Sequence, residues 1–180
     1  MSKFRATTIL AVRRDDQFAM IGDGQVTRGD VVTKHRARKI RRLHHDTVVA
    51  GFAGSAADGI TLLDRFEAHL EQSGGRLRRA AVDLAKEWRT DRFLRRLEAE
   101  LLAMSGDDIL MITGEGDVIE PDEGVAAIGS GGVYAQAAAT ALLRHTELNA
   151  RDIARAAMSV ASEMCIYTNT DVVLETLPNE

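Results

Sequence analysis

TTILAVR (Thr7–Arg13) and FAMI (Phe18–Ile21) are the two stretches of sequence that decide the fold of this chain. In the first stretch the apolar side chains alternate in a way that is typical of a strand with one buried face. The second stretch follows the polar turn RDDQ (Arg14–Gln17), and the Gly-Asp-Gly run at 22–24 ends it. The pattern therefore predicts a β-hairpin at the start of the chain.

Downstream, the apolar residues change from strand spacing to helix spacing and back, twice. Strands are predicted around 31–32, 40–43, 47–52, 108–113, 118–119, 125–128 and 172–177. Helices are predicted from a cap at Ser55 to a stop at Gly74-Gly75, from Leu77 onward, over 134–145 and over 150–164. The second helix is expected to continue, with a break near Thr90, through Leu101. Hairpins in blocks and helices in pairs predict an α+β fold, in which helices cover antiparallel sheets.

The composition is that of an ordinary soluble globular protein. The 180 residues fit one domain, and 45% hydrophobic and 28% charged residues are usual values. A formal charge of −4 gives no general reason to expect nucleic acid or an anionic membrane as partner. A single cysteine excludes an internal disulfide. The chain starts without the apolar segment of a secretory signal, and no apolar run approaches the ~20 residues of a membrane span. We expect a cytoplasmic protein with one domain, residues 7–180, after a short leader, residues 1–6.

Thr7 is the first candidate for chemistry, because one cleavage before it would make it an N-terminal residue. Its hydroxyl would then be the nucleophile, and its own α-amine, which titrates near pH ~8, would be the base. While the leader is attached, the Thr7 nitrogen is an amide and cannot accept a proton. Thr-Thr is also a common strand sequence, so the hypothesis depends on the rest of the chain.

Two other segments allow both a structural and a functional interpretation. GSGG (Gly129–Gly132) follows a predicted strand and opens a predicted helix, so it is either a tight turn or a place for a serine beside a reacting centre. A dinucleotide site is disfavoured, because Tyr134 stands where its fingerprint requires glycine. Six of the nine residues from Lys34 to Arg42 are Lys or Arg. These residues are either a strand edge with solvated charges or a phosphate-binding patch. A third interpretation is that one of them, Lys39, turns inward and has Asp23 as its ion partner.

The remaining reactive side chains favour structural roles. His44 and His45 lie at a predicted strand end with no further His or Cys at ligand spacing, which favours a turn over a zinc site. Cys165 lies between two apolar residues and suits a buried thiol.

Several segments together resemble the HslV (ClpQ) family of bacterial peptidases. They occur in the family's order and at about its spacing, and they are Ala6–Ile9, Gly22–Gln25, Arg38–Leu43, Ala50–Gly54, Trp88–Arg92, Ala127–Gly132, Tyr134–Ala139 and Cys165–Asn169. Each segment is weak alone, and the combination is specific. The resemblance implies the N-terminal-nucleophile (Ntn) hydrolase fold of proteasome β-subunits, a four-layer αββα sandwich of two antiparallel sheets between helical layers.

The resemblance also assigns roles to residues of this chain. Thr7 matches the nucleophile, and Lys39 matches the lysine whose charge lowers the pKa of the amine and favours the transition state. Asp23 matches the carboxylate that orients that lysine. Ser130 matches a serine beside the amine, and Gly51 matches the glycine whose backbone N–H stabilises the oxyanion.

Further expectations concern ions and partners. The resemblance implies a Na⁺ site made of main-chain carbonyls, matched here by Ser162, Cys165 and Thr168, with Ser162 where the family often has glycine. It implies no cofactor for the chemistry. It also implies two stacked six-membered rings and an ATPase partner of the AAA+ class, HslU (ClpY), which alone would use ATP to unfold substrate proteins and feed them in. No nucleic acid or membrane partner is expected.

The N-terminus departs from the commonest family pattern, in which threonine directly follows the initiator methionine. Either cleavage between Ala6 and Thr7 exposes Thr7, or removal of Met1 exposes Ser2 as the nucleophile. Only Thr7 keeps the family's spacing to Asp23 and Lys39, which favours it. The other functions considered are a small-molecule amidase of the same fold, a ring subunit with an inactive site, and a nucleic-acid binder based on residues 34–42.

Overall fold

The hairpin at the start of the chain forms the centre of a four-stranded antiparallel sheet. The computed structural model describes residues 4–5 and 7–178, the first two by their backbone alone. β2 (Thr8–Arg14) pairs with β3 (Gln17–Asp23), as the sequence predicts. β11 (Val125–Gly129) lies beside β2, and β12 (Val172–Leu177) lies beside β3. Most of the predicted leader, including Ser2 and Ala6, lies outside the described residues.

A second antiparallel sheet of five strands packs against the first. Its central strands are almost completely buried, as the continuous apolar run near residue 50 indicates. In spatial order the strands are β10 (Val118–Ile119), β9 (Ile109–Thr113), β8 (Ala99–Met104), β7 (Val48–Gly54) and β6 (Ile40–Leu43). A small third sheet has the order β1 (Phe4–Arg5), β4 (Val26–Arg28), β5 (Val31–Lys34).

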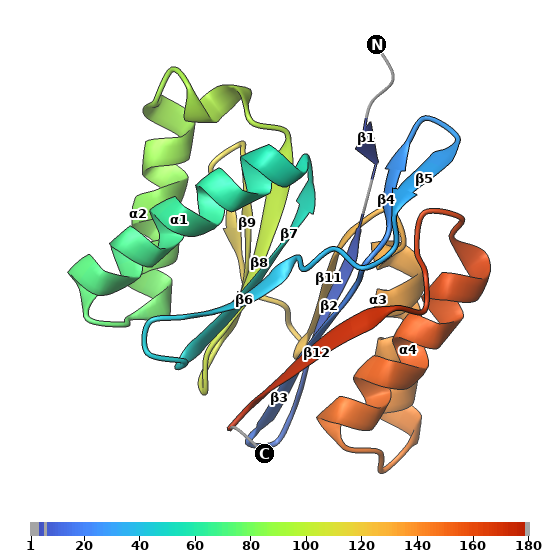
Figure 1. Ribbon diagram of the computed structural model, residues 1–180. Helices are drawn as coiled ribbons and strands as arrows, with labels where there is room; N and C mark the ends of the chain where they lie inside the picture. The colour runs from blue at the N-terminus through green and yellow to red at the C-terminus, as the bar shows by residue number, and fades with distance from the viewer. Residues whose placement is uncertain (1–3, 6, 179–180) are drawn as a thin grey trace.

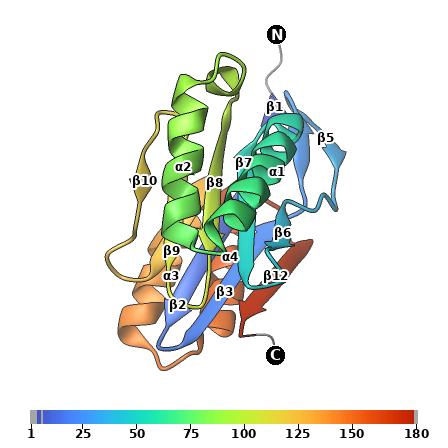
Figure 2. The ribbon, with the colours of Figure 1, turned by 90° about the vertical axis from the view of Figure 1, so that its left-hand side faces the viewer.

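Two pairs of helices cover the outer faces of the two large sheets, so that four layers result (Figure 1). One pair lies over β7 and β8 (Figure 2), and the other packs on β2, β3 and β11. The first pair is α1 (Ala56–Ser73) and α2 (Leu77–Thr90), and the second is α3 (Gly132–His145) and α4 (Ala150–Met164). This is the antiparallel αββα arrangement expected from the sequence.

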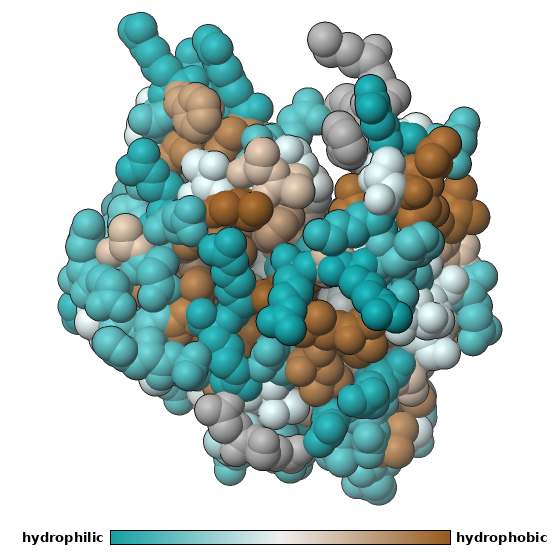
Figure 3. Space-filling model, viewed as in Figure 1, coloured by the Kyte–Doolittle hydropathy of each residue, from teal (hydrophilic) through white to brown (hydrophobic). Residues whose placement is uncertain are grey.

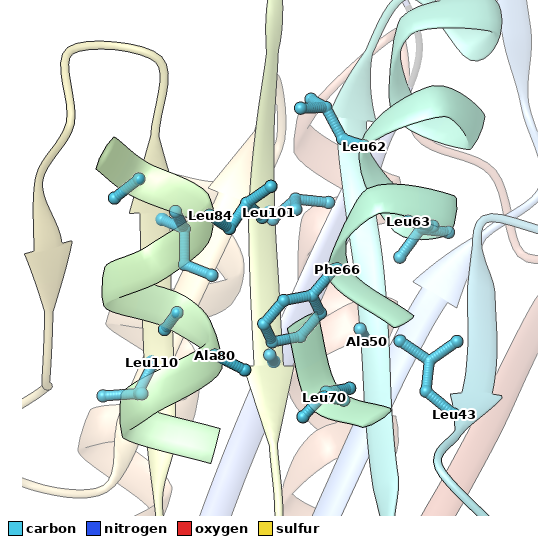
Figure 4. Packing of buried hydrophobic residues seen from close by; sticks show 14 of the residues in the cluster. Leu43, Ala50, Leu62, Leu63, Phe66, Leu70, Ala80, Leu84, Leu101 and Leu110 are labelled. Atoms are coloured by element: carbon cyan, nitrogen blue, oxygen red, sulfur yellow. The ribbon is translucent and has the colours of Figure 1, made fainter. Parts of the chain in front are cut away.

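A hydrophobic cluster of buried residues fills each interface between neighbouring layers. Between the first helix pair and its sheet, Phe66 of α1 lies among Leu84 of α2 and Leu101 of β8 (Figure 4). Ile9, Met20 and other side chains fill the space between the sheets, and alanines of α3 and α4 pack closely on the other face of β2 and β3. None of the helices among the described residues is long and apolar enough to cross a membrane.

The expected continuation of the second helix is wrong. α2 ends at Thr90, and a single 3₁₀ turn, Leu94–Arg96, leads into β8. Leu101 packs towards the helices, whereas its neighbour Leu102 packs between the sheets. Burial on both faces of a strand produces a dense apolar run, and periodicity alone does not distinguish such a run from a helix.

The glycines end α1 as predicted, but the expected serine cap is incomplete. Gly74 is in the left-handed conformation (φ 64°), and its N–H bonds back to the carbonyls of Glu71 and Leu70. Ser55 occupies the N-cap position without a side-chain cap hydrogen bond.

The basic segment from Lys34 to Arg42 is not a uniform surface patch. Arg41 and Arg42 pair with Asp64 and Glu175, and the Lys39 side chain is buried. Because acidic side chains face several of these cations, the segment gives little support to a phosphate-binding surface.

Candidate active site

Thr7 occupies the residue just before β2, where the backbone is strained. Its φ is 113°, a conformation that is rare for a β-branched residue, and its side chain is fully buried. Its carbonyl accepts the N–H of Ser130 at 3.0 Å. A Cβ added at Gly129 would lie 2.0 Å from that carbonyl oxygen, so only glycine fits there. The Thr7 hydroxyl is buried and has no hydrogen-bond partner among the described residues. Strain and an unpaired buried hydroxyl are features of functional sites.

Asp23, the last residue of β3, accepts hydrogen bonds from four directions. Its Oδ1 accepts the N–H of Thr8 at 2.8 Å and lies 3.4 Å from Lys39 Nζ. Its Oδ2 accepts the N–H groups of Gln25 at 2.9 Å and Asn169 at 3.3 Å. These bonds compensate the loss of water around a carboxylate that is almost completely buried. They also fix its position beside the strand that starts at Thr8.

Lys39 precedes β6, and its ammonium group reaches back to the end of β3. Nζ donates to the carbonyl of Gln25 at 2.5 Å and to Asp23. Burial lowers the pKa of Lys39 from 10.5 to about 8, although the charge of Asp23 acts in the opposite direction. A buried lysine that titrates near neutral pH is a typical component of an active site.

Thr7 and Lys39 line the same cavity, which has a volume of about 590 Å³. Its walls come from the β4–β5 hairpin, the segment before β6, the end of β7 and the start of α1, and Figure 3 shows the surface hollowed in this region. Apolar side chains such as Val26, Phe52 and Ile60 form much of the lining. The cavity could therefore hold an apolar side chain of a peptide beside the Thr7 hydroxyl. A separate depression of about 440 Å³ near Arg13 contains none of the candidate residues.

The structure places Gly51 and Gly54 of β7 differently with respect to this cavity. Gly51 lies inside the sheet, opposite Ile40 and Leu102, and does not line the cavity. The N–H of Phe52 bonds to the carbonyl of Lys39 on the β6 side. N–H directions alternate along a strand, so the Gly51 N–H points towards β8. By the same alternation the Gly54 N–H points to the β6 side, at a position where β7 has no pairing residue in β6. Gly54 lines the cavity and has φ 117°.

Ser130 contacts Thr7 through its backbone. Its N–H holds the Thr7 carbonyl, and its side chain is exposed. The turn Gly129–Gly132 is the tight connection from β11 to α3 that the sequence predicts. Its backbone holds the Thr7 carbonyl in place.

Thr8 and Asn169 are positioning residues that the sequence analysis did not single out. Thr8 Oγ1 accepts the N–H of Gly131 at 2.9 Å and lies 2.7 Å from Thr168 Oγ1. Asn169 donates its N–H to Asp23 and accepts the N–H of Gly24 at 3.2 Å. The partners are far apart along the chain, so no local pattern indicates them.

Comparison with known proteins identifies the family of this chain. The sequence model described as "Proteasome subunit" matches residues 3–177, which is nearly the whole chain. The chain belongs to the proteasome family. It is similar to eukaryotic HslV from Trypanosoma brucei, with 48% identity and a TM-score of 0.90 over 94% of this chain and 98% of that one. BPH from Thiobacillus denitrificans shares the fold at 21% identity, with a TM-score of 0.68 over 94% of this chain and 97% of that one. A structure of BPH in complex with epoxomicin is similar at 22% identity and the same TM-score.

This proteasome-family chain is therefore an HslV-like peptidase subunit with the Ntn-hydrolase fold. The fold and the family that the sequence predicts are confirmed. The roles of individual residues remain predictions.

The described part of the leader lies against the small sheet of this proteasome-family chain. The backbone of Phe4 pairs with Arg28, and that of Arg5 pairs with Thr27, in antiparallel register. β4 borders the cavity through Val26. Residues 4–5 are thus held as a strand next to the candidate site.

The three residues expected to bind Na⁺ lie together at the end of α4 and in the turn that follows it. Ser162 is in the last turn of the helix, and Cys165 is its C-cap. The carbonyl of Cys165 accepts the N–H of Thr168 at 3.0 Å. Thr168 in turn contacts Thr8, so this turn supports the candidate active site.

Proposed function

We propose that this chain is a threonine-type endopeptidase subunit whose nucleophile is the Thr7 hydroxyl after removal of residues 1–6. The observation that carries the proposal is the buried Thr7 hydroxyl, which has no hydrogen-bond partner in the described part of the chain. It lies in the same cavity as Lys39, a lysine whose pKa is lowered to about 8. The two groups come from segments that are distant in sequence, and Asp23 contacts both Lys39 and the residue after Thr7.

In the proposed reaction, the liberated α-amine of Thr7 takes the proton of its own hydroxyl as Oγ1 attacks the peptide carbonyl. The tetrahedral oxyanion accepts a backbone N–H. We assign this donor to Gly54 in place of Gly51, because the Gly54 N–H faces the cavity side of β7. The amine then protonates the leaving nitrogen, and an ester to Thr7 remains. Water, deprotonated by the same amine, hydrolyses the ester and restores the hydroxyl.

Lys39 and Asp23 act on this cycle through charge. An ammonium group near Thr7 favours the unprotonated amine and stabilises negative charge that develops on Oγ1 and on the oxyanion. Asp23 fixes the position of the ammonium group and compensates part of the cost of its burial. Ser130 holds the Thr7 carbonyl, which limits rotation of the nucleophile.

The identity of the mature N-terminus provides a sharp test. N-terminal sequencing of active protein should give Thr-Thr-Ile. Thr7→Val, with Ser2 retained, keeps the shape of the side chain but removes the nucleophile, and it should abolish peptidase activity. Retained activity in this variant would assign the reaction to Ser2 or to another group. Thr7→Ser is the matched control, and it should retain part of the activity because the hydroxyl remains.

The partners follow from the resemblance and are part of the same proposal. Two stacked rings of six subunits would enclose the sites, and an AAA+ ATPase such as HslU (ClpY) would deliver unfolded proteins in the cytoplasm. Degradation of unfolded casein should require the cognate ATPase and ATP. Cleavage of small amides with no effect of the ATPase would favour the amidase alternative instead.

A Na⁺ ion at Ser162, Cys165 and Thr168 fits the donors at the end of α4. The carbonyls of a last helical turn lack intrahelical partners, and this end of a helix attracts cations. The Cys165 carbonyl has a second lone pair beyond the bond to Thr168. The ion would stabilise the turn whose Thr168 contacts Thr8. Exchange of Na⁺ for choline should lower the melting temperature, and an unchanged melting temperature would contradict the site.

A further inference from the structure

The turn between β6 and β7 has an unusual backbone. His44, His45 and Asp46 have φ values of 46°, 55° and 64°, so three consecutive non-glycine residues adopt the left-handed conformation. The left-handed conformation is unfavourable for residues with a Cβ, and such strain is concentrated at binding and catalytic sites. The turn lies beside the C-terminal end of α1 (Figure 1).

The strained turn brings two imidazoles next to a carboxylate of α1. One possible ligand atom from each of His44, His45 and Glu71 lies within 4.8 Å of the other two, and no other group of three such side chains occurs in the described part of the chain. His44 Nδ1 is 3.1 Å from Glu71 Oε1. Two ligands of a tetrahedral ion with bonds of about 2.1 Å are separated by about 3.4 Å. This pair is therefore already at a suitable spacing, and His45, which is exposed, has a ring nitrogen within 4.8 Å of a possible ligand atom of each of the other two residues.

The His44 ring is held in the orientation that such a site requires. A Cβ at Gly75 would lie 2.4 Å from His44 Nε2, so this edge of the ring packs on the bare backbone of a glycine. The opposite edge, with Nδ1, faces Glu71. The His44 N–H donates to both carboxylate oxygens of Glu67, at 3.0 and 3.2 Å. Contacts of this kind reduce the entropy lost when a ligand set closes around an ion.

The electrostatic surroundings favour a cation. The last turn of α1 contains no basic residue, so the negative end of the helix faces the turn together with Glu67 and Glu71. The nearby arginines are engaged by other acids, since Arg41 pairs with Asp64 and Arg42 pairs with Glu175.

We propose that His44, His45 and Glu71 bind one divalent transition-metal ion, with water in the remaining coordination positions. Two imidazoles and one carboxylate suit Zn²⁺ and its neighbours in the first transition row, and not Mg²⁺ or Ca²⁺, which prefer oxygen ligands alone. The ion joins the β6–β7 turn to the C-terminal end of α1. It lies outside the proposed peptidase site and does not depend on the function assigned to Thr7.

Calorimetric titration of the metal-free, full-length protein with zinc chloride tests the site. The wild type should bind one ion per chain. His45→Asn removes an imidazole while asparagine tolerates the left-handed backbone, and Glu71→Gln removes the carboxylate. Each should weaken binding at least tenfold, in the range known for the loss of a supporting metal contact. The matched control is His145→Ala, which removes an exposed histidine of α3 and should leave binding unchanged.

Thermal unfolding gives an independent readout. Zinc should raise the melting temperature of the wild type and of His145→Ala, but not that of His45→Asn, in which His44 and Glu71 remain. Millimolar binding by the wild type, or equal affinity in the wild type and His45→Asn, would overturn the proposal. An effect of Ca²⁺ as large as that of Zn²⁺ would overturn the assignment to a transition metal.

Discussion

The protonated Lys39 side chain should destabilise the fold, and the variant Lys39→Met makes this measurable. In the wild type the Lys39 side chain is 3% exposed, and burial lowers the pKa of Lys39 from 10.5 to about 8. A shift of this size corresponds to about 3 kcal/mol of unfolding free energy. Methionine has a similar length and no charge, so the variant lacks this cost. It does leave the Gln25 carbonyl without its donor, but a neutral lysine still donates, so this loss does not vary with pH.

The sign of the pH dependence follows from the direction of the shift. Below pH 8 the lysine is protonated in the folded and the unfolded chain, so the full cost is present. Between pH 8 and 10.5 the folded chain has lost the proton and the unfolded chain retains it, so the wild type gains stability as the pH rises. From pH 7 to pH 10 the wild type should gain about 2.5 kcal/mol relative to Lys39→Met.

Urea unfolding of both proteins at pH 7, 8, 9 and 10, at equal protein concentration, measures this difference. The variant should also lose peptidase activity at every pH, because the charge near Thr7 is absent. If the unfolding free energies of the two proteins change in parallel over this range, the pKa of Lys39 is not lowered by the fold, and the electrostatic part of the mechanism fails.

Three further substitutions test the site and the core. Asp23→Asn leaves the Lys39 ammonium without its buried partner, and it should lower the unfolding free energy by about 3–5 kcal/mol in urea unfolding. A loss under about 1 kcal/mol would contradict the buried pair. Gly129→Ala places a Cβ 2.0 Å from the Thr7 carbonyl at φ 86° and should abolish peptidase activity, and normal turnover of a fluorogenic peptide would refute this contact. Trp88→Phe removes a buried indole N–H that has no partner among the described residues, so the unfolding free energy should change by less than about 1 kcal/mol. A loss of about 3 kcal/mol in the same urea measurement would show that packing of the larger ring dominates at this position.

The elements that were predictable from the sequence are those whose ends are marked by turn or cap residues. The single buried face expected for the first strand is wrong, because β2 packs on the second sheet with one face and on α3 and α4 with the other. The polar turn that follows Arg14 separates β2 from β3, and Gly74 ends the helix in which Leu63, Phe66 and Leu70 recur at helical spacing. The error at Leu101 arises where a strand is buried on both faces, because its pattern then resembles that of a buried helix.

The predicted site residues that meet in the structure are Thr7, Asp23, Lys39 and, through its backbone N–H, Ser130, each at or next to a strand end. The family resemblance indicated these residues, and it also indicated Gly51, whose N–H faces β8. The sequence could not show this, because the direction of a backbone N–H depends on strand pairing and not on residue type. Glu71 near His44 was missed for a similar reason, because only the packing of α1 against the β6–β7 turn brings the two together.

The pairing of residues 4–5 with β4 has a consequence for how the protein starts to work. In the maturation proposed above, the bond before Thr7 is cut and this short segment departs. β4 would then become an open edge, and an open edge readily accepts another extended chain. We expect incoming polypeptides to take the vacated place in the same antiparallel direction. The exposed edge of β4 would then serve as the template on which every later cleavage is aligned.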